Sequence, residues 1–129
     1  MAQATGGFEV RGWDEQPWDE PAEGGKLTRA EVTIEYTGDV DATATIQWLM
    51  AYAPDSTARY VGLQRMTGTV AGRPGTFVLE SSGDFAGGVA RGVLIVVPGS
   101  GTGELAGLTG QGTFEAPQGS SGTYRLDLA

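Results

Sequence analysis

The chain has 129 residues, a formal net charge of −8, and neither cysteine nor histidine. This length fits one domain, residues 1–129, and the acidic surplus argues against binding to nucleic-acid phosphates or anionic lipid. Disulfides, thiolate metal sites and histidine-based catalysis are excluded by composition. We expect no cofactor and no metal.

The first ten residues, MAQATGGFEV, lack the basic and apolar regions of a signal peptide. No later apolar run approaches the roughly 20 residues that cross a bilayer as a helix. We therefore expect a cytoplasmic protein that does not enter a membrane.

The 22 glycines, the frequent turn residues and the lack of sustained helical periodicity predict short strands separated by turns. The predicted strands are residues 4–13, 27–37, 40–52, 58–70, 75–84, 88–97, 110–116 and 122–128. An even number of short strands favours an all-β fold, an eight-stranded antiparallel up-and-down barrel.

The segment after the first strand, residues 13–21, repeats a Trp-Asp-Glu unit and is rich in carboxylates. Calcium needs about six to eight oxygens on a tightly turned loop, and the spacing here matches no known calcium loop. We interpret the segment as an acidic, solvated loop whose tryptophan rings close one barrel end. A mobile lid is the alternative.

Residues 27–37 and 40–52 alternate cleanly between apolar and polar side chains, which indicates strands with one buried face. The even-numbered residues are predicted to face inward. They are Ala30, Val32, Ile34 and Tyr36, followed by Ala42, Ala44, Ile46, Trp48, Met50 and Tyr52. A one-residue slip would invert every side chain, so the loop around Gly38 must have odd length.

The next two strands admit two registers. If the even parity continues, Tyr60, Gln64 and Met66 face inward, and a loop centred on Gly72 sets Gln64 opposite Glu80. A single β-bulge reverses the parity. The alternative inward set is then Leu63, Arg65, Phe77, Leu79 and Ser81. We adopt the even register, which brings two polar side chains together inside an apolar lumen.

Residues 75–97 are apolar on both faces of the predicted strands. Contiguous exposed apolar surface is rarely left to water, so we expect a homo-oligomer, most simply a homodimer, that uses this outer face. The following residues, 99–106, contain a G-x-G-x-x-A pattern without the helix that a dinucleotide site requires, and are interpreted as a glycine-dependent connection.

The candidate ligand-binding residues are the predicted inward aromatic and sulfur-containing side chains: Tyr36, Trp48, Met50, Tyr52, Tyr60 and Met66. Such side chains adapt to irregular apolar shapes, although ordinary core filling explains them as well. Glu80 is the candidate catalytic residue, because an inward carboxyl group in apolar surroundings has a raised pKa and exchanges protons near neutrality. An outward, solvated Glu80 is the alternative.

Several segments resemble known families. The segment 101–110, Gly-Thr-Gly-Glu-Leu-Ala-Gly-Leu-Thr-Gly, resembles the GTG-x-x-x-G-x-x-G signature of allene oxide cyclases and dirigent proteins. Residues 8–13, 27–30, 49–52, 61–63 and 77–79 are similar to the bacterial domain of unknown function 3224 family. The resemblance implies an allene-oxide-cyclase-like barrel of eight antiparallel strands, often oligomeric, in a family whose general activity is unassigned. Related barrels cyclise or isomerise bound lipophilic substrates.

These observations lead to three functional hypotheses. The first is a cyclase or isomerase that folds a small apolar or polyketide-like substrate in the lumen, with Glu80 as proton donor or acceptor and Gln64 orienting it. The second is a lipocalin-like carrier of an apolar metabolite. The third is a packed barrel that serves as an interaction module.

Overall fold

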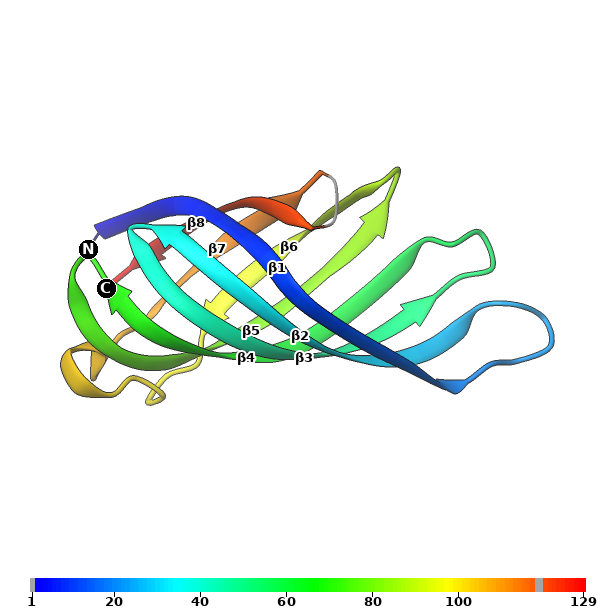
Figure 1. The fold of residues 1–129 in the computed structure, drawn as a ribbon, viewed down its shortest axis with the longest axis horizontal. Coiled ribbons are helices and arrows are strands. Elements are labelled where there is room, and N and C mark those ends of the chain that lie inside the picture. The colour runs from blue at the N-terminus through cyan, green and yellow to red at the C-terminus, as the bar shows by residue number, and fades with distance from the viewer. Residues whose placement is uncertain (1, 118–119) are drawn as a thin grey trace.

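The computed structural model describes residues 2–117 and 120–129, which form a closed barrel of antiparallel strands (Figure 1). Each strand pairs with the next along the chain, and the first pairs with the last. The elements are β1 (Ala2–Asp19), β2 (Lys26–Gly38), β3 (Val40–Tyr52), β4 (Ala58–Val70), β5 (Arg73–Ala86), β6 (Val89–Val96), the 3-10 turn η1 (Gly103–Leu105), β7 (Gly110–Ala116) and β8 (Ser121–Leu128).

The predicted all-β fold with eight antiparallel strands is confirmed. The resemblance of this barrel to allene oxide cyclases stays a prediction. Among the described residues, none belongs to a helix with the length and hydropathy that a bilayer crossing requires.

Strand β1 is longer than predicted, because the acidic segment that we interpreted as a loop continues the strand to Asp19. A β-bulge lies between Val10 and Gly12. It shifts the inward face from even to odd numbers, so Trp13 pairs with the inward Val32 and Glu15 with the inward Ala30. The loop prediction for residues 13–19 is therefore wrong.

The even-numbered inward face predicted for β2 and β3 is confirmed by the alternating burial of both strands. The ladder continues into β4, where Trp48 pairs with Gly62. A Cβ atom on Gly62 would lie 2.8 Å from the Trp48 ring. Glycine at this position therefore leaves room for the indole inside the barrel.

The predicted register of β4 against β5 is wrong by one residue. Val70 pairs with Arg73, so only Ala71 and Gly72 form the turn, both with positive φ of 49° and 80°. Two-residue hairpin turns with positive φ at both positions match the right-handed twist of the strands. Gln64 consequently pairs with Leu79 and not with Glu80.

Because of this short turn, the odd-numbered residues of β5 face inward, whereas the even-numbered residues face inward in β4 and β6. Phe77, Leu79 and Ser81 are buried inside the barrel, whereas Glu80 is exposed on the outer face opposite Leu63 and Ile95. The inward placement of Glu80 is therefore wrong. The alternative register is correct for β5 and wrong for β4, where Leu63 and Arg65 are exposed.

One end of the barrel is closed by the connection between β6 and β7. Thr102 donates its backbone N–H to the Thr76 carbonyl at 2.8 Å, and its Oγ1 accepts the Thr76 N–H at 3.0 Å. The connection also buries Leu105 and Leu108. Both chain termini lie at this end, and the β1–β2 and β3–β4 turns lie at the opposite end (Figure 1).

Candidate functional site

A cavity of about 240 Å³ lies inside the lumen, toward the open end of the barrel. Its wall is mostly aromatic and aliphatic. The lining residues are Phe8, Val10, Trp13, Val32, Ile34, Tyr36, Trp48, Met50, Tyr52, Ala58, Tyr60, Gln64, Phe85, Ala90, Leu94, Phe114 and Ala116. None of these described lining residues is charged.

Aromatic rings form a connected cage around this cavity. Trp48 and Tyr60 meet edge to face with 4.7 Å between ring centroids, and Phe114 lies 6.4 to 6.5 Å from both. A Cβ atom on Gly92 would lie 2.8 Å from the Phe114 ring. The glycine in β6 thus makes space for the ring of its β7 partner. Tilted and edge-to-face contacts of this kind fix the positions of the rings.

A buried polar chain crosses the lumen between β2, β4 and β5. The Tyr36 hydroxyl donates to Gln64 Oε1 at 2.7 Å, and Gln64 Nε2 donates to Ser81 Oγ at 3.0 Å. Burial raises the pKa of Tyr36, so its hydroxyl stays protonated at physiological pH. These three hydrogen-bonded side chains therefore offer neutral polar groups in apolar surroundings. Two of them, Tyr36 and Gln64, belong to the cavity wall.

The mouth of the cavity carries a carboxylate that accepts three hydrogen bonds. Glu15 Oε2 accepts the Thr28 hydroxyl at 2.6 Å and the Tyr52 hydroxyl at 2.7 Å. Its Oε1 accepts the Trp13 indole N–H at 3.0 Å. The Lys26 ammonium lies 5.0 Å from the Tyr52 ring centroid. Glu15 therefore ties β1 to β2 and β3 across the mouth.

Burial and hydrogen bonding have opposite effects on Glu15. Partial burial on its own would raise its pKa, but the bonds from Thr28, Tyr52 and Trp13, together with the Lys26 charge, outweigh it and lower the pKa below its ordinary value. Desolvation, and secondly the bond to Glu15, raise the pKa of Tyr52. The pair is thus a carboxylate and a neutral phenol at physiological pH.

The structure brings together most of the residues that the sequence nominated. Tyr36, Trp48, Met50, Tyr52, Tyr60 and Gln64 all line the cavity. Met66 is fully buried in the packed half of the barrel, and Glu80 lies outside. Whether the lining residues bind a substrate stays a prediction.

Sequence reasoning expected the tryptophan rings of residues 13–21 at one barrel end but did not nominate Trp13 or Glu15 as site residues. Both reach the mouth because of the bulge in β1. Gly12 lies at the first of two register shifts in β1, and an isolated glycine in a strand is a recognised sign of a bulge. Within residues 2–117 and 120–129, no three acidic side chains come together in the manner of a metal site.

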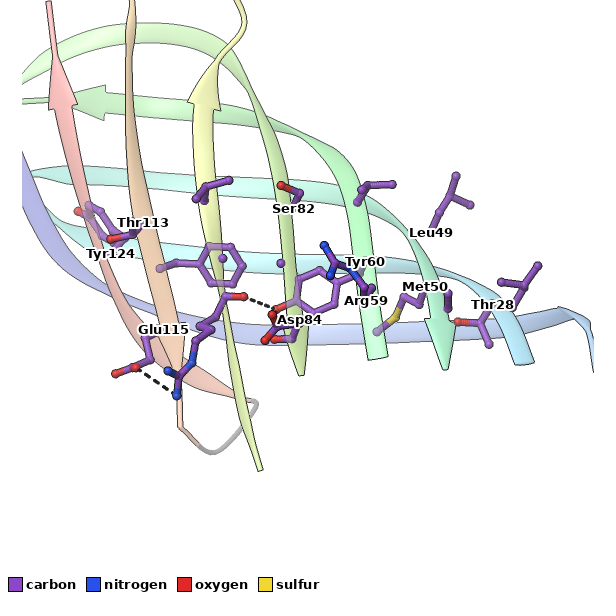
Figure 2. Close-up of a pocket in the computed structure, with 18 of the residues that line it drawn as sticks. Thr28, Leu49, Met50, Arg59, Tyr60, Ser82, Asp84, Thr113, Glu115 and Tyr124 are labelled. Carbon is purple, nitrogen blue, oxygen red and sulfur yellow. Dashed lines mark hydrogen bonds and ion pairs between the residues drawn. The ribbon is translucent and has the colours of Figure 1, made fainter. Parts of the chain in front are cut away.

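A second hollow, of about 910 Å³, is a groove on the outer wall (Figure 2). One side carries Leu49, Val61 and Val93, and the other carries charged residues, including the Arg91–Glu115 ion pair at 3.8 Å. Figure 2 shows Ser82 and Asp84 along β5, with Arg59 and Tyr60 nearby. The groove is more open to solvent than the lumen cavity, so we assign the candidate site to the lumen, where a ligand loses more contact with water.

Comparisons with known proteins place the chain in a family. A family model described as "Protein of unknown function (DUF3224)" matches residues 4–128. A crystal structure of a protein with unknown function from the DUF3224 family, from Shewanella oneidensis MR-1, matches with a TM-score of 0.81 and 28% identity over 100% of this chain and 97% of that chain. A search of curated proteins found no match. The chain therefore belongs to the DUF3224 family.

Proposed function

We propose that the protein binds one compact, mostly apolar molecule in the lumen cavity. The observation that carries this proposal is the cavity of about 240 Å³ inside the barrel. A dry apolar cavity of about 150 Å³ is enough for benzene, and pockets for drug-sized ligands start at about 300 Å³. The size therefore suits a ring with a short substituent and excludes a long acyl chain.

Binding is better supported than acid–base catalysis. The carboxylate that we expected as catalyst, Glu80, lies on the outer face, and the described lining of the cavity contains no acidic residue. The hydroxyl groups of Tyr52 and Tyr60 are directed at Glu15 and at the Asp84 and Arg91 carbonyls, respectively. Glu80 therefore does not act as an acid or base on a molecule in the lumen.

A cyclase or isomerase is the second candidate function, and the aromatic cage is the observation that favours it. The rings of Trp48, Tyr60 and Phe114 support one another through close contacts. A rigid wall of this kind can hold a reactive molecule in one folded conformation, which accelerates a ring closure without an acid or base. This candidate requires the same occupied cavity as the first.

Two substitutions on one strand test the site. Ala90 in β6 lines the lumen and Val93 in β6 lines the outer groove, so Ala90→Phe fills the cavity and Val93→Phe adds the same ring outside. Binding of ethylbenzene, measured by calorimetry on the full chain, should be lost in Ala90→Phe and kept in Val93→Phe. The reverse pattern would move the site to the groove, and no binding by the unmodified protein would contradict the proposal.

Self-association through the outer face stays a prediction. The most exposed apolar side chains on β3 to β6 are Leu49, Val61, Leu63, Val93 and Ile95, which are 40–55% exposed. They extend the predicted surface from β5 and β6 to the two preceding strands. Light scattering at micromolar concentration should report twice the mass of one chain, and a single-chain mass would contradict the prediction.

A further inference from the structure

The cavity wall holds a hydrogen-bond donor that has no acceptor among the described residues. Trp48 is only 8% exposed and lines the cavity, yet its indole N–H makes no hydrogen bond to residues 2–117 or 120–129. Every fully enclosed side-chain nitrogen and oxygen in this part of the chain has a partner. The Trp48 nitrogen is therefore not fully enclosed, and the cavity that this buried side chain lines offers it room for an acceptor.

A second donor comes from Gln64. An amide group carries two N–H bonds, and the described residues supply one acceptor for them, Ser81 Oγ. Ser81 is 1% exposed and is not among the described residues that line the cavity. Tyr36 holds the amide oxygen and Ser81 holds one N–H, so the remaining N–H of this cavity-lining residue is available to a ligand.

The uncharged lining of the lumen limits the charge that a ligand can carry. The described lining contains no arginine, lysine, aspartate or glutamate. Moving an unpaired charge into such surroundings costs several kcal/mol or more. A carboxylate or an ammonium ion is therefore a poor ligand for the cavity, whereas a neutral oxygen that accepts hydrogen bonds fits the two available donors.

We propose that the lumen selects a neutral ring compound with one carbonyl oxygen, which accepts hydrogen bonds from the Trp48 indole and the Gln64 amide. This inference rests on the proposed function, since it requires an occupied cavity. A carbonyl oxygen has two lone pairs and so has the capacity for both hydrogen bonds. The apolar ring lies among the aromatic side chains toward the mouth, and Ser81 is a positioning residue that orients the Gln64 amide.

Two probes of nearly equal shape test the carbonyl. Acetophenone and ethylbenzene differ mainly in the oxygen, so calorimetry on the full chain should give acetophenone roughly tenfold tighter binding, the ratio that one net hydrogen bond supplies. Trp48→Phe keeps an aromatic ring and removes the N–H. The ratio of the acetophenone affinity to the ethylbenzene affinity should fall severalfold, and the prediction concerns this ratio because Trp48 also lines the cavity.

A spectroscopic readout locates the contact. In the unmodified protein, the indole N–H resonance of Trp48 and the side-chain amide resonances of Gln64 should shift on addition of acetophenone and much less on addition of ethylbenzene. The comparison of probes needs no variant, so it stays decisive even if Trp48→Phe fails to fold.

Each alternative outcome has a defined meaning. Equal affinity for acetophenone and ethylbenzene overturns the carbonyl inference and leaves lumen binding intact. Binding of benzoate as tightly as acetophenone overturns the requirement for a neutral ligand. Failure of both neutral probes to bind overturns the inference together with the proposed function.

Discussion

The two ends of the barrel use the same alternating strands but fill the lumen differently. Toward the closed end, Met66, Phe77 and Leu79 interlock and the β6–β7 connection adds Leu105 and Leu108. All five are at most 5% exposed. Toward the mouth, the row that runs across β4 to β7 contains Ala58, Phe85, Ala90 and Ala116. The three alanines leave a space that the neighbouring rings do not fill.

The comparison shows what decides between a core and a cavity in a small barrel. An eight-stranded barrel is just wide enough to be filled by side chains or to hold one small ligand. At the closed end, large residues face one another and a loop covers them. At the mouth, alanine replaces large residues and Glu15 only ties neighbouring strands together. Stability should therefore depend mainly on the closed end, and ligand binding on the mouth.

Truncating one phenylalanine at each end tests this division with the largest effect. Phe77→Ala should lower the free energy of unfolding by about 3–5 kcal/mol, because it leaves a void in a packed region. Phe114→Ala should cost clearly less, because its ring already borders the cavity. Urea unfolding of both variants measures the difference. Equal losses would show that the mouth is packed as tightly as the closed end.

Removing one tyrosine hydroxyl at each end gives a smaller contrast. Tyr124 donates to the Thr37 carbonyl at 2.8 Å and accepts the buried Val40 N–H at 2.9 Å near the β2–β3 turn. Tyr124→Phe leaves this N–H without a partner and should cost about 1–3 kcal/mol. Tyr52→Phe should cost less than about 1 kcal/mol, because Glu15 at the mouth keeps two other donors.

Hydrogen exchange provides the local readout for the tyrosine pair. The Val40 amide should exchange faster in Tyr124→Phe and at the normal rate in Tyr52→Phe. A larger loss of stability in Tyr52→Phe than in Tyr124→Phe would reverse the assignment of the two ends.

The strands β3 and β4 could be predicted from the sequence to the residue. The alternation of β3 is clean, and Gly62 of β4 fits beside Trp48 in the register that the short turn implies. The lining residues on these strands followed from the same parity. Local periodicity was sufficient for β3, and the inward face of β4 followed from continuing the even parity of β3 across the turn.

The position of Glu80 could not be obtained in this way. Strand β5 is apolar on both faces, so its composition does not reveal which residues point inward. The turn length decides, and Ala71 adopts a positive φ of 49°, a conformation that is uncommon for alanine. One residue in that turn separates an inward Glu80 from the observed inward Ser81.

The end of strand β1 was predicted wrongly for a related reason. Pro17 and the carboxylates around it suggested a loop, but among the described residues the ladder with β8 ends at Glu9, and residues 12–19 continue the strand by pairing with β2. An edge position tolerates proline and charged side chains, which composition alone does not distinguish from a loop.

The smallest expected effect is a pH dependence of the unfolding free energy, which comes from Glu15 at the mouth. The pKa of Glu15 is lowered in the folded protein, so its contribution to stability is present above the pKa of the unfolded chain and is lost as the pH falls through the folded value. The carboxylate is partly exposed, so solvent screening should keep this contribution below about 1 kcal/mol.

Glu15→Gln keeps the shape of the side chain and removes its titration. At neutral pH the variant should be slightly less stable than the unmodified protein, because a neutral amide oxygen accepts weaker hydrogen bonds from Thr28 and Tyr52 than a carboxylate does. Lowering the pH protonates Glu15 and should bring the two unfolding free energies together. Urea unfolding at a series of acidic and neutral pH values measures this convergence. A difference that stays constant over the series would mean that the carboxylate is held by its shape and not by its charge.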